Sequence, residues 1–308
     1  MNSRRAITLV GTAVLLASMA GVVLMVRRLD DLRLGTTARD VLYIPSPMIV
    51  KRLSLGYGGL LADIYWTRVV QYFGGKHHER SMEYKLLDPL LDITTTLDPQ
   101  LVPAYEFGAT FLAQKPPEGA GDPDRAVALV EKGIRANPRS WRLYYNLGYI
   151  EYIERKDYTA AARAFERGTQ VPGAHPWMKI MAAIMAQHGG EIGTARFLWQ
   201  HIYESTEDKM IKENAVKHLV ALQVDEAVPY LEALLRQYHE NTGKQAGSWF
   251  EMISSGYLKG MPADPLGKPF KLLPGGPVEV QDPDSLPFIT RGLPPGKEAP
   301  EFLKSGSK

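Results

Sequence analysis

The fold of this chain is decided by residues 144–153, YYNLGYIEYI, and residues 158–165, YTAAARAF. Apolar residues recur in both stretches at spacings of three and four, which predicts two amphipathic helices. Gly148 and Ala161 would face each other across this helix pair, because only small side chains let two helix axes approach to the short end of the usual distance of about 8–10 Å. Large residues such as Phe165 would then fill the space between successive pairs.

The same arrangement recurs along the chain. Ala126, Ala161 and Ala195 lie 35 and 34 residues apart. Pro138 and Pro172 follow the first two alanines and would end the second helix of each pair, because the residue before a proline is driven out of the α region. The sequence therefore predicts a repeated helix pair with a period of about 34 residues.

A period near 34 with helical patterning is typical of tetratricopeptide repeats, and residues 60–241 resemble that family. The resemblance implies an all-α solenoid of stacked helix pairs that acts through its contacts with other proteins. A first pair is expected at residues 60–73 and 81–96, and a last pair at 209–222 and 225–238. The small residues expected to hold the helices together are Gly108, Ala126, Gly148, Ala161, Ala183 and Ala195, with Gly108 facing Ala126.

The N-terminus contains an uncharged, largely apolar run, residues 6–26, between two pairs of arginines. At a rise of 1.5 Å per residue such a helix is about 31 Å long, enough to cross a hydrocarbon core of about 30 Å. We therefore expect a transmembrane anchor over residues 1–28 that contacts lipid through residues 6–26, followed by a juxtamembrane segment over 29–59. A cleaved signal peptide ending at Ala20 is the alternative, although the apolar run continues beyond that residue.

The orientation of the body depends on two opposed observations. More arginines follow the apolar run than precede it, which favours a body on the cytoplasmic side. However, that topology would move a charged N-terminal tail across the membrane, and long domains translocate largely regardless of their charge. We expect a single-pass protein of a bacterial inner membrane with a periplasmic body, and a cytoplasmic body is the alternative.

The C-terminal extension, residues 242–308, has ten prolines between positions 262 and 300, which excludes a long helix there. Residues 270–273 and 278–280 are expected to pair as a short β-hairpin across the PGGP turn at 274–277. This part resembles the C-terminal hairpin of the major pseudopilins of type II secretion, a family in which nearby acidic residues bind calcium. The acidic residues available here are Asp264, Asp282 and Asp284, and a structural turn is the favoured interpretation over a calcium site.

Motifs for chemistry are missing from the sequence. It has no cysteine, HExxH helix, phosphate-binding glycine loop or nucleophile elbow. A net charge of +2 on 308 residues gives no basic footprint for nucleic acid. We therefore expect no enzyme activity, no cofactor or metal and no nucleic-acid partner.

The first helices of stacked pairs would line a concave groove. The residues expected to face it are Tyr105, Arg142, Tyr145, Tyr149, Tyr152, Ile180 and Ile184. A groove lined mainly by tyrosine suits an apolar or extended peptide, because tyrosine gives a large contact area at little entropic cost. The alternative is that the rings pack against neighbouring helices or the C-terminal segment.

These features together predict a membrane-anchored protein-interaction scaffold that serves assembly or secretion across a bacterial envelope. The alternative is a cytoplasm-facing membrane adaptor that regulates a membrane enzyme or its turnover. Both functions depend on the anchor and on the groove.

Overall fold

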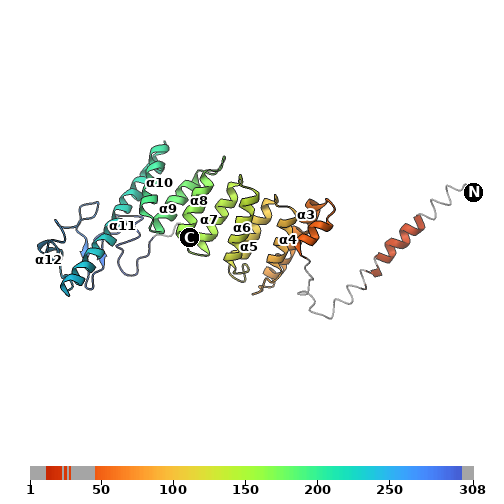
Figure 1. Ribbon diagram of the computed structural model, residues 1–308, viewed down its shortest axis with the longest axis horizontal. Coiled ribbons are helices and arrows are strands. Elements are labelled where there is room, and N and C mark those ends of the chain that lie inside the picture. Colours follow the sequence, from red (N-terminus) through yellow and green to blue (C-terminus); the bar gives the residue numbers. More distant parts are fainter. Residues whose placement is uncertain (1–11, 23, 26–27, 29–45, 300–308) are drawn as a thin grey trace, which may run out of the picture.

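The computed structural model describes residues 12–22, 24, 25, 28 and 46–299. From residue 46 onwards, antiparallel helices follow one another in a single elongated row, with a small β-hairpin beside the last long helix (Figure 1). This arrangement confirms the predicted helical solenoid and its C-terminal hairpin.

The array consists of helix pairs that appear in chain order. Their bounds are α2 (Pro47–Leu53), α3 (Gly58–His78), α4 (Leu87–Leu97), α5 (Val102–Ala113), α6 (Pro123–Ala136), α7 (Trp141–Ile153), α8 (Tyr158–Thr169), α9 (Trp177–His188), α10 (Ile192–Ser205) and α11 (Lys209–Thr242). The pairs are α3 with α4, α5 with α6, α7 with α8 and α9 with α10. Each first helix also lies beside a helix of the preceding pair, as α7 does with α5 and α6.

Aspartate side chains cap the N-termini of two of the second helices, α6 and α8. Asp122 accepts a hydrogen bond from Arg125 N at the start of α6, and Asp157 accepts one from Ala160 N at the start of α8. Asp208 caps α11 in the same way. Such caps satisfy amide groups that have no partner inside the helix, so the chain direction reverses at defined residues.

Small residues lie at the close helix contacts, but the side chains nearest to Gly148 and Gly108 are larger than the predicted alanines. Gly148 of α7 faces the ring of Phe165, where a Cβ atom would come within 2.7 Å, rather than Ala161. Ala161 lies one turn earlier on α8, and the larger ring fills the space that Gly148 leaves. Gly108 faces Leu91 of α4, in the preceding pair, rather than Ala126.

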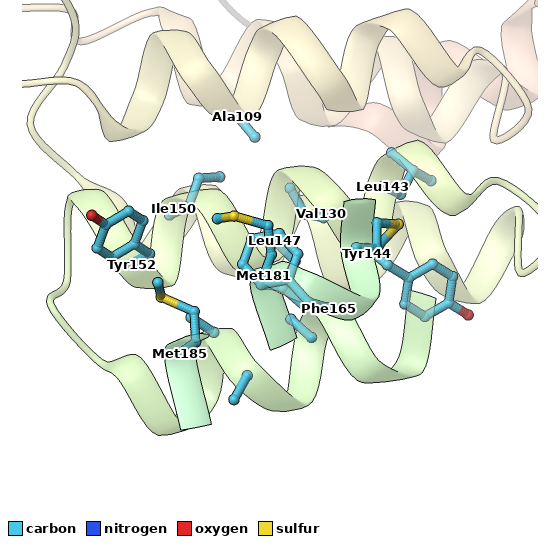
Figure 2. Close-up of a cluster of buried hydrophobic side chains, with 14 of the residues drawn as sticks. Ala109, Val130, Leu143, Tyr144, Leu147, Ile150, Tyr152, Phe165, Met181 and Met185 are labelled. Atoms are coloured by element: carbon cyan, nitrogen blue, oxygen red, sulfur yellow. The ribbon is translucent and has the colours of Figure 1, made fainter. Parts of the chain in front are cut away.

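The other predicted packing residues are inside the array. Ala126, Ala161, Ala183 and Ala195 are fully buried. They belong to one continuous apolar cluster that extends from Val69 on α3 to Leu222 on α11. Figure 2 shows part of this cluster, to which α5 to α9 all contribute side chains.

The predicted last helix pair is wrong, because residues 209–222 and 225–238 form one helix, α11. No glycine or turn sequence separates the two halves, and Pro229 is accommodated inside the helix. The second half is held by a second apolar cluster, in which Val228, Leu231 and Leu235 pack against the C-terminal extension.

The C-terminal extension folds back onto α11. It contains α12 (Trp249–Ser254), β1 (Lys271–Leu272) and β2 (Val278–Glu279). The two strands pair antiparallel, with Lys271 opposite Glu279 and Leu272 opposite Val278. Trp249 Nε1 donates a hydrogen bond of 2.7 Å to Phe270 O, which ties α12 to the start of the hairpin. The domain boundaries predicted at 59/60 and 241/242 stay predictions.

The predicted transmembrane helix is contradicted by the structure. In the part of the chain that the structure describes, no helix is long and apolar enough to cross a membrane. Residues 6–11, 23 and 26 of the predicted span lie outside the described residues. This finding overturns the predicted transmembrane helix and the single-pass inner-membrane localisation. The juxtamembrane segment and the lipid contact stay predictions.

Candidate functional site

A cavity of about 440 Å³ opens on the face made by the first helices of three successive pairs. Helix α5 contributes Glu106, Phe107 and Thr110 to its lining, and α7 contributes Trp141, Arg142, Tyr145 and Asn146. His175, Trp177 and Met178, at and before the start of α9, complete it. The cavity therefore lies where the sequence places the concave groove.

Three of the predicted groove residues are accessible on α7. Arg142 is exposed, Tyr145 is 37% exposed and Tyr149 is 38% exposed. They lie three and four residues apart, so they share one face of the helix. The Tyr145 ring also meets the edge of Phe165, with ring centroids 5.8 Å apart, which supports it from beneath. On α9, Ile180 is half-buried and Ile184 is buried.

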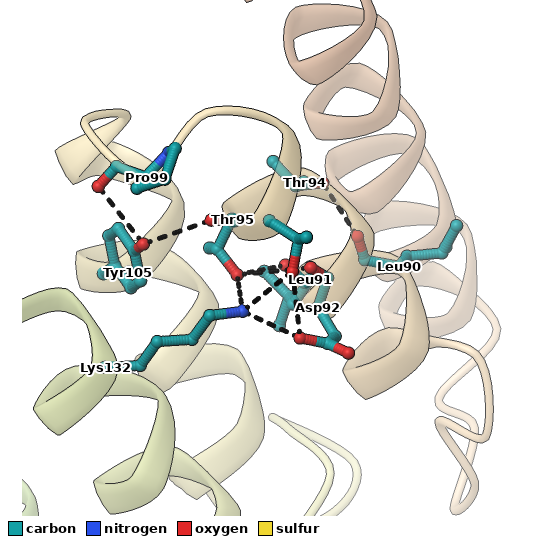
Figure 3. A network of polar contacts seen from close by, with 9 residues as sticks. Leu90, Leu91, Asp92, Thr94, Thr95, Pro99, Tyr105 and Lys132 are labelled. Carbon is teal, nitrogen blue, oxygen red and sulfur yellow. Dashed lines mark hydrogen bonds and ion pairs between the residues drawn. The ribbon is translucent and has the colours of Figure 1, made fainter. Parts of the chain in front are cut away.

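Tyr105 and Tyr152 do not belong to the accessible groove. Tyr105 is fully buried, and its hydroxyl donates to Pro99 O at 3.2 Å and to Thr95 O at 3.4 Å (Figure 3). Burial raises the pKa of Tyr105 to about 12. The ring of Tyr105 occupies the space beside Gly133, which has no side chain to exclude it.

Tyr152 is buried for a different reason. The loop between α7 and α8 returns over its ring, with Lys156 Nζ 5.7 Å from the ring centroid. The ring of Tyr158 at the start of α8 lies 5.8 Å away. The short turn between the two helices thus covers the last tyrosine of the predicted strip.

Two residues of the cavity lining each have a buried acceptor without a partner. These atoms are Glu106 Oε1 and Asn146 Oδ1, which have no hydrogen-bond partner in the described structure. The amide nitrogen of Asn146 donates to the backbone oxygen of Glu106 at 3.3 Å. Burial raises the pKa of the Glu106 carboxyl, and the positive charge of Arg142 opposes this rise.

Sequence reasoning missed Glu106, Asn146 and the rings of Phe107, Trp141 and Trp177. Each polar residue is the immediate neighbour of a predicted groove tyrosine, Tyr105 or Tyr145, and is therefore rotated by about 100° around the helix. On α5 the predicted groove register was wrong by this one position, because Tyr105 is buried and Glu106 lines the cavity. The aromatic residues at the cavity rim are the signal in the sequence that points to this cavity.

A second polar cluster on the other side of the array is already saturated. Lys132 Nζ of α6 donates to Asp92 Oδ1 and to Thr95 Oγ1 of α4, both at 2.8 Å (Figure 3). It also donates to Thr96 Oγ1 at 3.2 Å. These bonds connect two successive helix pairs and leave the ammonium group little capacity for a ligand.

The three aspartates considered for calcium have separate local roles. Asp264 Oδ1 accepts hydrogen bonds from the backbone amides of Leu266 and Lys268, both at 2.9 Å. Asp282 pairs with the Lys268 side chain, and Asp284 pairs with Lys297. No group of three or more potential metal ligands of the His, Cys, Asp or Glu type occurs among the described residues.

Comparison with known protein families matches residues 118–175 to the tetratricopeptide repeat. The matched residues include α6, α7 and α8, and with them the α7 wall of the cavity. No curated protein matches the chain. The match and the helical solenoid both support a tetratricopeptide repeat protein, and such repeats, which are typically non-catalytic, point to a protein–protein interaction scaffold.

Proposed function

We propose that this protein binds an extended segment of a partner protein along the face formed by α5, α7 and α9. The observation that carries the proposal is the pair Tyr145 and Tyr149, more than a third exposed and one turn apart, beside a cavity to which three successive first helices contribute. Tyrosine rings with accessible faces are efficient contacts for peptides, because few rotamers are lost on binding.

The chemistry of this face favours a peptide over a terminal carboxylate as the main determinant. Arg142 is the cation of the cavity lining, and its guanidinium group lies over the Trp141 ring, 5.8 Å from the centroid. The remaining lining is largely aromatic or polar and uncharged, with Glu106 and His175 as the other titratable groups besides Tyr145. An apolar or aromatic segment would therefore bury more surface here than a carboxylate would.

The proposal is limited to protein binding. The expectations of envelope assembly, of secretion and of a membrane adaptor depended on the predicted anchor. The calcium alternative and the pseudopilin resemblance likewise have no support from the C-terminal aspartates.

The test is binding of full-length protein to a fluorescein-labelled library of random decapeptides, followed by anisotropy titration of the retained sequences. We expect the double substitution Tyr145→Ala with Tyr149→Ala to weaken binding by about thirtyfold, because removal of a central aromatic contact commonly costs about 2 kcal/mol. Thermal melting of the variant is measured in parallel, because Tyr145 also supports Phe165.

Tyr230→Ala is the matched control. Tyr230 is 61% exposed on α11 and lies outside the cavity lining, so its removal should leave binding unchanged. Equal losses in the double variant and in the control, or full binding by the double variant, would contradict the proposal.

A further inference from the structure

We propose that the cavity between α5, α7 and α9 selects a basic side chain, an arginine or a lysine, in the partner's extended segment. This inference rests on the proposed function, because it names the side chain that the groove would recognise. It departs from the expectation that the groove selects apolar sequence alone.

Two unpaired acceptors in the cavity lining support a ligand that donates hydrogen bonds. Glu106 Oε1 and Asn146 Oδ1 are both buried and both lack a hydrogen-bond partner in the described structure. Because Asn146 Nδ2 donates to Glu106 O, its Oδ1 atom is the end of the amide that remains available. Buried acceptors without donors are rare in folded proteins and are costly, so these two atoms indicate that a donor from outside completes the site.

The charge of the Glu106 carboxylate favours a cationic donor. One of the two acceptors is a carboxylate, and charge-assisted hydrogen bonds are about twice as strong as neutral ones. A guanidinium group has five N–H donors and an ammonium group has three, so either has enough donors for two acceptors. A neutral backbone amide offers one donor and no charge, and therefore satisfies this pair less well.

The aromatic rim of the cavity also favours a cation. The rings of Phe107, Trp141 and Trp177 line the same cavity, and Phe107 and Trp177 are 56% and 39% exposed. The faces of such rings attract cations within about 6 Å of the ring centroid. Arg142 already adopts this geometry over Trp141.

The effect of substituting Arg142 on binding distinguishes a basic ligand from an acidic one. Its side chain is exposed, so solvent and salt screen its repulsion of an incoming cation, whereas Glu106 Oε1 is shielded from water. Neutralising Arg142 should therefore not weaken the binding of a basic side chain. If the cavity instead bound a carboxylate, the same substitution would weaken binding.

The experiment uses full-length protein and four pools of random decapeptides. Their central residue is fixed as arginine, lysine, citrulline or glutamate, and citrulline is the neutral analogue of arginine. We expect the arginine and lysine pools to bind at least about tenfold more tightly than the citrulline pool, as loss of a charged hydrogen-bond partner commonly costs a factor of this size. Glu106→Gln should bring this ratio close to one, and Arg142→Gln should not reduce it.

A second variant covers the case in which Glu106→Gln fails to fold. Trp177→Leu removes a rim ring and keeps the acceptors, so it should reduce the ratio of arginine to citrulline binding. A ratio near one for the unmodified protein would overturn the inference. Preference for the glutamate pool, lost in Arg142→Gln, would overturn it as well.

The two proposals fail in different ways. If the double tyrosine variant weakens binding of every pool while the arginine preference is missing, the result supports the groove proposal and contradicts the basic-side-chain site. If the unmodified protein retains none of the pools, the groove proposal is wrong and this inference falls with it.

Discussion

Single glycines decide how closely the helices of this array approach. A Cβ atom on Gly148 would lie 2.7 Å from the Phe165 ring, and one on Gly133 would lie 2.7 Å from the Tyr105 ring. Both contacts are too short for a rigid ring to accept without a shift. The tight neighbour in each case is an aromatic side chain that the hydrophobic cluster holds in place.

The pair Gly148→Ala and Gly193→Ala tests this dependence. Gly193 lies within α10 with nothing within 4 Å of the position of a Cβ atom, so alanine there should stabilise the protein by about 0.5–1 kcal/mol through helix propensity. Gly148→Ala gains the same propensity but must displace Phe165, which should make it net destabilising, by up to about 3 kcal/mol. Chemical denaturation of both variants measures whether each substitution raises or lowers the free energy of unfolding. A stabilising effect at Gly148 would show that the α7–α8 contact is looser than described.

His218 is a buried base inside a polar network. Its ring is stacked between Trp199 and Phe288, at centroid distances of 3.9 and 4.0 Å. Nδ1 lies 2.8 Å from Gln187 Oε1, which accepts, so Nδ1 carries the proton of the neutral ring. Burial, with a smaller contribution from His188, lowers the pKa of His218 to about 3.

This depressed pKa predicts acid sensitivity. Between an ordinary value near 6.5 and about 3, the unfolded chain binds a proton that the folded protein does not, so this group removes roughly 1.4 kcal/mol of stability per pH unit as pH falls. Burial raises the pKa of Asp225, whose folded state binds a proton more readily, and this acts in the opposite direction. The measurement is therefore the stability difference between the wild type and His218→Gln. The wild type should be the more stable protein at pH 7.5, and the difference in free energy of unfolding should become smaller towards pH 4. A difference that does not change with pH would contradict a neutral buried ring.

Helix α11 connects the array to the C-terminal extension. Its first half completes the large cluster with Ala215 and Leu222, and its second half forms the second cluster with the extension. At the junction, Asp225 is 2% exposed and accepts from Gln187 Nε2 at 2.9 Å. It also accepts from the backbone amides of Thr290 and Arg291, at 2.7 and 2.9 Å.

Asp225→Ala should release the segment around Thr290. Three donors lose their common acceptor, and a buried donor without a partner costs about 1–3 kcal/mol. We expect faster amide hydrogen exchange at Thr290 and Arg291, with a loss of global stability of about 2 kcal/mol or more. Glu226→Ala is the control, because Glu226 is exposed and its ion pair with Arg196 is worth at most about 1 kcal/mol. Unchanged exchange at both amides would show that other contacts hold the segment.

The elements that were predicted correctly have local signatures. Period and proline placement indicated the helix pairs from α3 to α10, and the PGGP turn at 274–277 indicated the hairpin. The continuity of α11 was not predictable in this way, because its second half is held by residues about 50 positions later in the chain. The burial of Tyr105 and Tyr152 and the acceptors Glu106 and Asn146 also depend on which residues meet between helices. The apolar run at residues 6–26 did not correctly predict a membrane-spanning helix, because none of the described helices is long and apolar enough.

The molecule as a whole is a row in which each pair contacts its neighbours (Figure 1). Besides a small apolar cluster between α2, α3 and α4, two larger ones divide the described residues. The large cluster extends from α3 to the first half of α11. The second joins the rest of α11 to the extension. In such a linear arrangement stability is approximately the sum of unit and interface terms, so local damage should remain local.

Two leucine substitutions of the same kind, at opposite ends, test this locality. Leu91 is fully buried on α4 against Gly108, and Leu235 is buried on α11 in the second cluster. Replacement of either by alanine should cost about 2–5 kcal/mol where it acts, because a cavity remains. Hydrogen exchange should quicken over α3 to α6 in Leu91→Ala and over residues 224–289 in Leu235→Ala, while the opposite end of each variant keeps its protection. A uniform loss of protection in both variants would mean that the array and the extension unfold as one cooperative unit.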